Sequence, residues 1–179
     1  MITLTTNRLL MREVEANDLP ALLPVYLSNP EQVMANEGSQ GEPGHYELAI
    51  FQRDWWLASL TPGRHMLGVY LLGTGIPIGL ADYLEDNPDD GQPWLGQLIT
   101  HADHQRKGYG AEAFCGLAAY FRAEYEWPTV RAGLARQNAT AQAFLLRLGF
   151  RIVTPASPPA DAQEDAHRRF VTLEYDLRD

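Results

Sequence analysis

One short glycine-containing segment is suited to binding an anion. Glycine adopts backbone conformations that other residues avoid, so two glycines spaced two apart allow a sharp turn. The N–H groups of residues 106–111 can then point into one concavity at a helix N-terminus, where unpaired donors and the helix dipole favour an anion. A pyrophosphate fits this description. The segment is Gln105, Arg106, Lys107, Gly108, Tyr109 and Gly110, followed by Ala111.

The charge of the segment supports this hypothesis. The chain carries a net charge of -9, yet Arg106 and Lys107 lie side by side here, and Lys107 is its only lysine among 14 basic residues. The alternative is a tight strand-to-helix turn with two convenient glycines. A Walker phosphate loop is excluded because the lysine precedes the glycine. A dinucleotide fingerprint is excluded because the preceding strands are expected to form a meander rather than a parallel unit.

Composition limits the remaining functions. A length of 179 residues fits one domain spanning residues 1–179. The acidic balance argues against general attraction to nucleic acid. No stretch is apolar enough to cross a bilayer, and the N-terminus lacks the pattern of a signal peptide. The single cysteine, Cys115, is expected to be a small buried residue in a reducing compartment. We therefore expect a cytoplasmic protein, and the five scattered histidines predict no metal site.

Periodicity predicts a mixed α/β protein. Strands are expected at 8–12, 66–72, 77–83, 94–100, 129–134, 150–153 and 170–177. Helices are expected at 19–26, 46–59, 109–124 and 138–148, and residues 36–45 and 154–166 are expected to be loops. The strands at 66–72, 77–83 and 94–100 are expected to form an antiparallel meander. Asn138 is placed to cap the helix that follows it, and Gly149 to end that helix.

Two motifs resemble those of the GNAT superfamily, the Gcn5-related N-acetyltransferases. Residues 105–110 look like its Gln/Arg-x-x-Gly-x-Gly/Ala motif. The segment from Asn138 to Phe150 resembles its next motif, in which an Asn opens a helix that closes with Leu-Gly-Phe. The opening strand from Arg8 to Glu13 is similar to that of the branch that includes the ribosomal-protein N-acetyltransferases. The order of the elements also matches.

The resemblance implies an α/β (α+β) fold with a mostly antiparallel sheet of six to seven strands, about four helices and a splayed central strand pair. The strands at 94–100 and 129–134 are that pair, and acetyl-coenzyme A is the implied co-substrate, with its pyrophosphate on residues 105–111. Its pantetheine arm is expected to pair with Leu98, Ile99 and Thr100. Asn138 and Phe144 are expected to flank it from the other side.

The implied reaction is direct transfer of an acetyl group to a primary amine in a ternary complex. A backbone N–H near Leu98 is expected to stabilise the developing oxyanion. An amine with an ordinary pKa of about 10.4 must first lose a proton. Relatives often use a strand carboxylate and a tyrosine acid, but this chain has Gln97 or Leu95 at the first position and Leu145 at the second. The remaining candidates for proton removal are water held by Gln97, Asp82, Tyr83 and His101.

The acceptor is expected to be a small-molecule or peptide amine, and the protein a monomer or homodimer. The acidic hairpin at 85–90 can attract a cationic amine or be a solvated turn, and Trp55 and Trp56 can line an acceptor pocket or pack in the core. Two other functions remain. One is a non-catalytic coenzyme A-binding or regulatory module on the same fold, and the other is an unrelated phosphate-binding domain.

Overall fold

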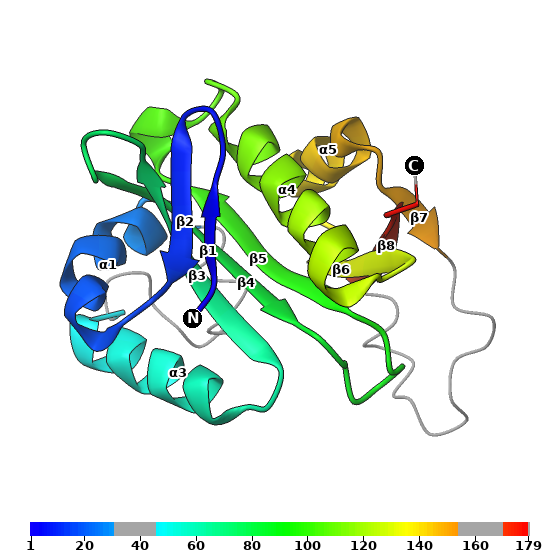
Figure 1. Ribbon diagram of the computed structural model, residues 1–179, viewed down its shortest axis with the longest axis horizontal. Coiled ribbons are helices and arrows are strands. Elements are labelled where there is room, and N and C mark those ends of the chain that lie inside the picture. The colour runs from blue at the N-terminus through cyan, green and yellow to red at the C-terminus, as the bar shows by residue number, and fades with distance from the viewer. Residues whose placement is uncertain (31–45, 154–169, 179) are drawn as a thin grey trace.

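The structure is a computed structural model, and it describes residues 1–30, 46–153 and 170–178. The two predicted loops, 36–45 and 154–166, lie outside the described residues. The described strands form one eight-stranded sheet in the order β1-β2-β3-β4-β5-β6-β8-β7 (Figure 1). The strands are β1 Thr3–Thr5, β2 Leu9–Glu13, β3 Arg64–Leu71, β4 Pro77–Leu84, β5 Trp94–Thr100, β6 Thr129–Ala135, β7 Arg151–Val153 and β8 Phe170–Asp176.

The predicted fold is confirmed, with one strand more than expected. Strands β3, β4 and β5 form the antiparallel meander. The additional strand, β1, has three residues and pairs antiparallel with β2. Its sequence, Thr-Leu-Thr, is too short to give a periodic signal, so only its pairing partner makes it a strand.

Helices cover both faces of the sheet. The α-helices within the described residues are α1 Leu19–Leu27, α3 Leu48–Leu60, α4 Tyr109–Tyr120 and α5 Ala139–Leu148. A π-helical turn, Phe121–Tyr125, extends α4. The core on one face joins residues of α4 and α5 to the sheet, with Phe114, Leu117 and Leu145 all buried. The core on the other face joins α1 and α3 to the sheet.

The two ends of α5 confirm the capping predictions. The side chain of Asn138 accepts a hydrogen bond of 3.0 Å from the amide of Ala141. Gly149 ends the helix with a φ of 104°, a left-handed conformation that glycine adopts without steric cost. Local residues therefore determine where this helix begins and ends.

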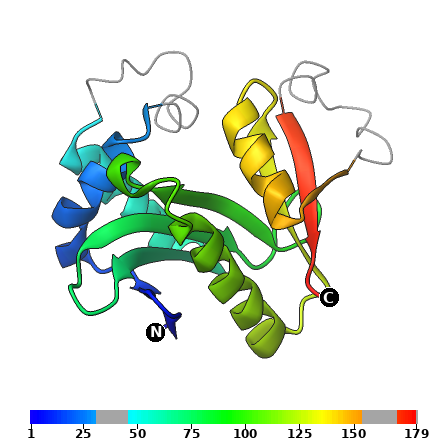
Figure 2. The same cartoon turned by 90° about the horizontal axis from the view of Figure 1, so that it is seen from above.

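The sheet opens between β5 and β6. These strands run parallel, and in the part of the chain that the structure describes they pair at only two positions, Trp94 with Arg131 and Leu95 with Ala132. Beyond Leu95 the strands separate, as Figure 2 shows from above. The expected splay is therefore present, and its open end lies at the C-terminal ends of both strands.

Cys115 is exposed on α4, so the prediction of a buried packing residue was wrong. Its neighbours Phe114 and Leu117 occupy the buried face of the helix instead.

No helix within residues 1–30, 46–153 and 170–178 has the length and apolar character needed to span a membrane.

Candidate active site

The predicted glycine segment forms a turn whose amides are free. Arg106 has a φ of 58° and Gly108 a φ of 83°, so the backbone is left-handed at both positions. Gly108 is the N-cap of α4, and its carbonyl accepts the first helical bond, from Glu112. Among the described residues, no acceptor pairs with the N–H groups of residues 106–110. These five amides, here called the amide cradle, provide donors for an anion at a helix N-terminus.

Side chains from two other elements hold the cradle in place. The side-chain amide of Gln105 donates a hydrogen bond to the Asn29 side chain at 2.9 Å and another to the Thr100 carbonyl at 3.0 Å. The Lys107 ammonium donates to the carbonyl of Asp103 at 2.8 Å. Gln105 therefore ties the loop to the end of β5 and to the end of α1, while Lys107 keeps its positive charge beside the cradle.

Arg8, which the sequence did not single out as a site residue, lies against the cradle. Its guanidinium donates to the Lys107 carbonyl at 3.1 Å and lies over the Tyr109 ring, 4.5 Å from its centroid. It also forms an ion pair with Glu112 in the first turn of α4. A Cβ added to Gly108 would stand 3.3 Å from the Arg8 Nη2 atom. Arg8 lies about 100 residues before the cradle in the sequence, so no local sequence pattern predicts this contact.

Glu112 connects the first hairpin to the start of α4. Its carboxylate accepts from the Thr6 hydroxyl at 2.6 Å and from the Arg8 amide at 2.8 Å, as well as from the Arg8 guanidinium. Burial raises the pKa of Glu112, but these hydrogen bonds outweigh burial and hold the pKa below its ordinary value. Glu112 is therefore ionised at neutral pH and anchors Arg8 beside the cradle.

The backbone of β5 faces the gap at alternate residues. The amide of His101 donates to the carbonyl of Ile78 on β4 at 2.8 Å. Because N–H directions alternate along an extended strand, Ile99 also points its N–H toward β4, whereas Leu98 and Thr100 point theirs toward the side of β6. The Thr100 carbonyl already accepts from Gln105 and Asn29. Of the three predicted pairing residues, Leu98 therefore has its backbone best placed in the gap.

Residues of α5 approach the cradle from the opposite side of the gap. A Cβ added to Gly110 would stand 3.2 Å from the Phe144 ring and 3.4 Å from the Thr100 hydroxyl. Phe144 therefore packs directly on the first turn of α4. Asn138 is half-buried at the start of α5, where its side-chain oxygen Oδ1 caps the helix by accepting from the Ala141 amide. The structure brings both residues to the side on which they were expected.

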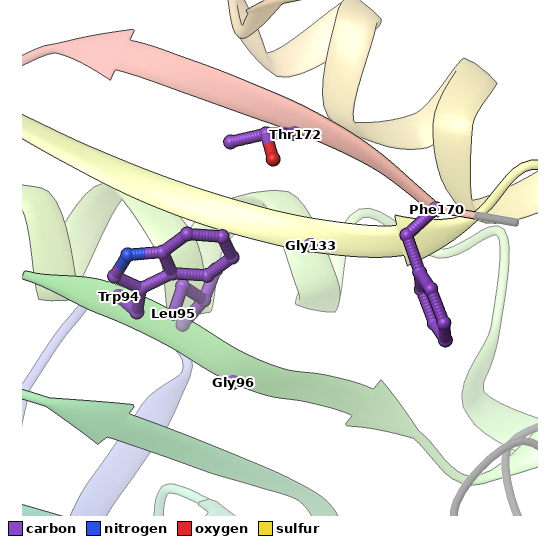
Figure 3. Close-up of a pocket in the computed structure, with 6 residues that line it drawn as sticks. All are labelled: Trp94, Leu95, Gly96, Gly133, Phe170 and Thr172. Atoms are coloured by element: carbon purple, nitrogen blue, oxygen red, sulfur yellow. The ribbon is translucent and has the colours of Figure 1, made fainter. Parts of the chain in front are cut away.

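A pocket of about 290 Å³ lies in the gap. It is lined by Trp94, Leu95, Gly96, Gly133, Phe170 and Thr172. Figure 3 shows the Trp94 ring rising from β5 toward β6, with Phe170 reaching down from β8. Sequence reasoning did not identify this pocket. The glycines inside β5 and β6 were the available signal, because a glycine within a strand often marks a close approach.

Asp82 lies against the wall of this pocket. A Cβ added to Gly96 would stand only 2.6 Å from the Asp82 Oδ1 atom, and the register of β4 and β5 shifts at this point. The side chain accepts a hydrogen bond of 3.0 Å from Arg64, which is itself 40% exposed. Asp82 is the buried charged residue of the described chain, at 3% exposure. Burial raises the pKa of its carboxyl above the ordinary value, and Arg64 only partly offsets this effect.

Two other candidates for proton removal lie near the same strand. Gln97 is half-buried and faces Asp82 across the β4–β5 pair. His101 follows β5, and its Nδ1 atom accepts a hydrogen bond of 3.2 Å from the amide of Asp103. His101 therefore organises the turn that leads into the cradle. The structure thus brings Asp82 and Gln97 together and leaves His101 at the strand end.

Tyr83 lies on the other face of the sheet. Its side chain is fully buried in the α4 core, and its hydroxyl is 3.1 Å from that of Tyr125. Burial, followed by the hydrogen bond with Tyr125, raises the pKa of Tyr83. The ring packs on His65, Phe121 and Trp127. This placement gives no support to a role for Tyr83 in proton transfer, because its hydroxyl is paired with that of Tyr125 within the core on the α4 face.

Two of the other residues predicted near the acceptor, Asp90 and Trp55, form hydrogen bonds within the protein. Asp90 of the acidic hairpin accepts hydrogen bonds from the Trp94 indole and from Arg131. The Trp55 indole donates to the carbonyl of Val14 at 3.1 Å, so Trp55 packs on the core, whereas Trp56 is 55% exposed. Within the described residues, no group of three or more His, Cys, Asp or Glu side chains is positioned to hold a metal ion.

One known protein family matches most of the chain. The model of the acetyltransferase (GNAT) domain matches residues 8–151, a range that includes the cradle, the gap and α5. No curated protein sequence matches the chain.

Several solved structures share the fold. An acetyltransferase from Thermus thermophilus is 23% identical, with a TM-score of 0.72 over 98% of this chain and 99% of that one. A ribosomal L7/L12 α-N-protein acetyltransferase in complex with coenzyme A is 12% identical, with a TM-score of 0.72 over 98% of each chain. A spermidine N-acetyltransferase chimera from Vibrio cholerae is 15% identical, with a TM-score of 0.64 over 94% of this chain and 95% of that one. At these identities the likeness shows the fold alone.

Proposed function

Because the chain belongs to the GNAT acetyltransferase family, we propose that it transfers an acetyl group from acetyl-coenzyme A to a primary amine. The observation that carries this proposal is the amide cradle at residues 106–110, which lies beside the gap between β5 and β6. An anion receives hydrogen bonds there without displacing any existing partner. The gap next to the cradle gives the remainder of an extended cofactor a path to the pocket.

The residues around the gap fit an acyl-coenzyme A ligand. The cradle, with Lys107 and Arg8 beside it, suits a pyrophosphate, and the free backbone of Leu98 suits an extended arm. Phe144 and Asn138 close the other side of the gap. When bound, acetyl-coenzyme A supplies an acetyl group activated as a thioester.

The chain's own groups then have distinct tasks. The N–H of Leu98 stabilises the negative charge that develops on the carbonyl oxygen during attack. Asp82 takes the proton of the acceptor amine, directly or through one water beside Gly96. Its raised pKa makes Asp82 a stronger base than an ordinary aspartate, and the charge of Arg64 favours its ionised form. Gln97, opposite Asp82, holds the water.

Transfer is direct, from the thioester to the amine, within a ternary complex. Cys115 is the only cysteine of the chain, and it is exposed on α4 rather than in the gap. An acyl-cysteine intermediate therefore has no nucleophile at the site. Initial rates at varied concentrations of both substrates should give intersecting lines in a double-reciprocal plot. The Cys115→Ser variant should keep the activity of the wild type, and parallel lines would contradict direct transfer.

The second candidate function is a coenzyme A-binding or regulatory module without turnover. It is favoured by one observation: Gln97 and Leu95 stand where relatives often carry a carboxylate, and Leu145, at the tyrosine position, is buried at 5% exposure. A thiol leaving group with a pKa of about 8–9 departs without an acid, so the missing tyrosine is tolerable. Asp82 replaces the missing carboxylate only if it reaches the amine.

The test combines binding and turnover. Calorimetry should show that acetyl-coenzyme A binds the wild type, and release of free thiol with a panel of primary amines should show turnover. The Gly110→Val variant should lose binding, because its side chain would collide with Phe144 and Thr100 at the first turn of α4. Ala119→Val, at an exposed position of the same helix, is the matched control and should bind normally. Binding without thiol release from any amine would favour the regulatory module.

A further inference from the structure

The pocket between β5, β6 and β8 has the character of a binding site for a flat apolar group. We propose that the acceptor is a small primary amine carrying one aromatic ring system, which contacts Trp94 and Phe170. This inference rests on the proposed function, since it assigns the acceptor class of the same site. Its support comes from the rigidity of one wall, the exposure of the other and the charges around them.

Trp94 forms a fixed wall. Its indole N–H donates to Asp90 at 3.0 Å, and Asp90 is held in turn by Arg131 at 2.8 Å. A Cβ at Gly133 would stand 2.8 Å from the Trp94 Cζ3 atom, so the indole lies directly over β6 at a position without a side chain. Any other residue at 133 would displace the ring. The indole face is therefore held ready for a planar partner at little cost in conformational entropy.

Phe170 forms another part of the pocket wall and is exposed. Its side chain is 55% exposed, although it lines the pocket. Covering an exposed aromatic ring with another apolar group removes unfavourable contact with water. Figure 3 shows that both aromatic side chains line the pocket, and an aromatic group bound there buries apolar surface of each. A pocket of about 290 Å³ accepts one ring-sized group, at the lower end of the usual range for small ligands.

The charges around the pocket disfavour a polycation. None of the six lining residues is charged. The neighbouring carboxylates of Asp90 and Glu174 both accept hydrogen bonds from Arg131, and Asp82 accepts one from Arg64. Within the described residues, Asp82 is the carboxylate that lies against Gly96, and besides its bond from Arg64 it can accept a single amine proton. The surroundings thus match one amino group attached to an apolar body rather than several amino groups along a chain.

The experiment compares two amines, tryptamine and spermidine, at saturating acetyl-coenzyme A. We expect kcat/KM for tryptamine to exceed that for spermidine. In Phe170→Ala, kcat/KM for tryptamine should fall about tenfold, mainly through KM, since the ring contributes binding rather than chemistry. The value for spermidine and the KM for acetyl-coenzyme A should not change. Ile152→Ala, which truncates an exposed side chain on the neighbouring strand β7, is the control and should match the wild type.

A binding measurement separates failure of the acceptor inference from failure of the proposed acetyltransferase function. Tryptamine should shift the NMR signal of the Trp94 indole N–H, assigned by its loss in Trp94→Phe, and spermidine should not. Faster turnover of spermidine, an unshifted indole signal, or a Phe170→Ala effect confined to the KM for acetyl-coenzyme A would overturn the inference. Failure of the proposed function is distinct, because it would appear as absent acetyl-coenzyme A binding or absent thiol release with every amine.

Discussion

Among the residues near the gap, Asp82 has the environment that best supports the proposed role of proton acceptor. Removing a carboxylate from water disfavours its ionised form, and here the compensating charge comes from one half-exposed arginine. Burial therefore favours the protonated carboxyl, while the ion pair with Arg64 favours the ionised one. A group in this condition can accept a proton from an amine and release it again to solvent through the exposed side of its pair with Arg64.

The first prediction concerns the pH dependence of turnover. In Asp82→Asn, kcat/KM should fall by about 10²-fold, the typical contribution of a general base. In the wild type, log kcat/KM should rise as Asp82 ionises, and this acidic limb should be absent from the variant. Asp89→Asn, in an exposed turn, should behave as the wild type. An unchanged acidic limb in Asp82→Asn would assign the proton to another group.

The same residue gives a prediction about stability that does not depend on catalysis. Because the folded-state pKa of Asp82 is raised, the folded chain binds this proton more tightly than the unfolded chain does. The stability from the protonated form is present at low pH and is lost as pH rises through the folded-state pKa. The free energy of unfolding of Asp82→Asn, measured in urea, should therefore rise relative to the wild type as pH increases from the ordinary aspartate pKa through the raised folded-state pKa. A constant difference would show that the carboxyl is not perturbed.

At the residue scale, the sequence predicted the cradle because its chemistry is local. Glycines at 108 and 110 and bases at 106 and 107 follow one another in the chain. It did not identify Arg8, Trp94 or Phe170 as site residues, because each becomes relevant only through strands that pair across long separations. Asp82 was a candidate, but its burial depends on the register shift at Gly96.

At the scale of elements, the start of α4 depends on the first hairpin. Thr6 and Arg8 both bind Glu112, so β2 and α4 are joined at the point where the cradle begins. A helix N-terminus that binds an anion benefits from such bracing, since its amides must keep their orientation while empty. The hairpin thus holds the start of α4 in place beside the amide cradle, as well as forming part of the sheet.

A third prediction tests this brace. Glu112→Gln should lower the free energy of unfolding by about 1 kcal/mol at pH 7, because it weakens charged hydrogen bonds to Thr6 and Arg8. The folded-state pKa of Glu112 is lowered, so its contribution is present at neutral pH and disappears as pH falls through that pKa. Urea unfolding at about pH 7 and pH 3 should show the difference shrinking. Glu124→Gln, exposed at the end of the same helix, should show no such trend.

A fourth prediction concerns α5. Leu145 is buried at 5% exposure, on the helix that carries Phe144 and Asn138. Leu145→Ala should cost about 2–4 kcal/mol of stability through lost burial and the remaining cavity. Thermal unfolding should show this loss, while kcat/KM per folded molecule should stay within about twofold of the wild type. The neighbouring Leu146→Ala, at 43% exposure, should cost little. A large loss of turnover at full stability would instead place Leu145 in the chemistry.

At the scale of the whole molecule, the open sheet brings these parts together. The cradle lies at one end of α4, the pocket lies between β5, β6 and β8, and Asp82 lies on the strand beside them. The order of elements was predictable because each long strand and helix has its own periodicity. The splay itself came from the family resemblance, since nothing in the periodicity of residues 94–100 or 129–134 reports where two strands stop pairing.

The most direct test of the central claim is an amide NMR titration with coenzyme A. The N–H signals of residues 106–110 should show the largest shifts of the chain, because these donors gain the pyrophosphate as their acceptor. Amides of the distant turn at Gly73 should remain unchanged. If coenzyme A leaves the signals of residues 106–110 unmoved, or shifts another region in their place, the amide cradle is not the cofactor site.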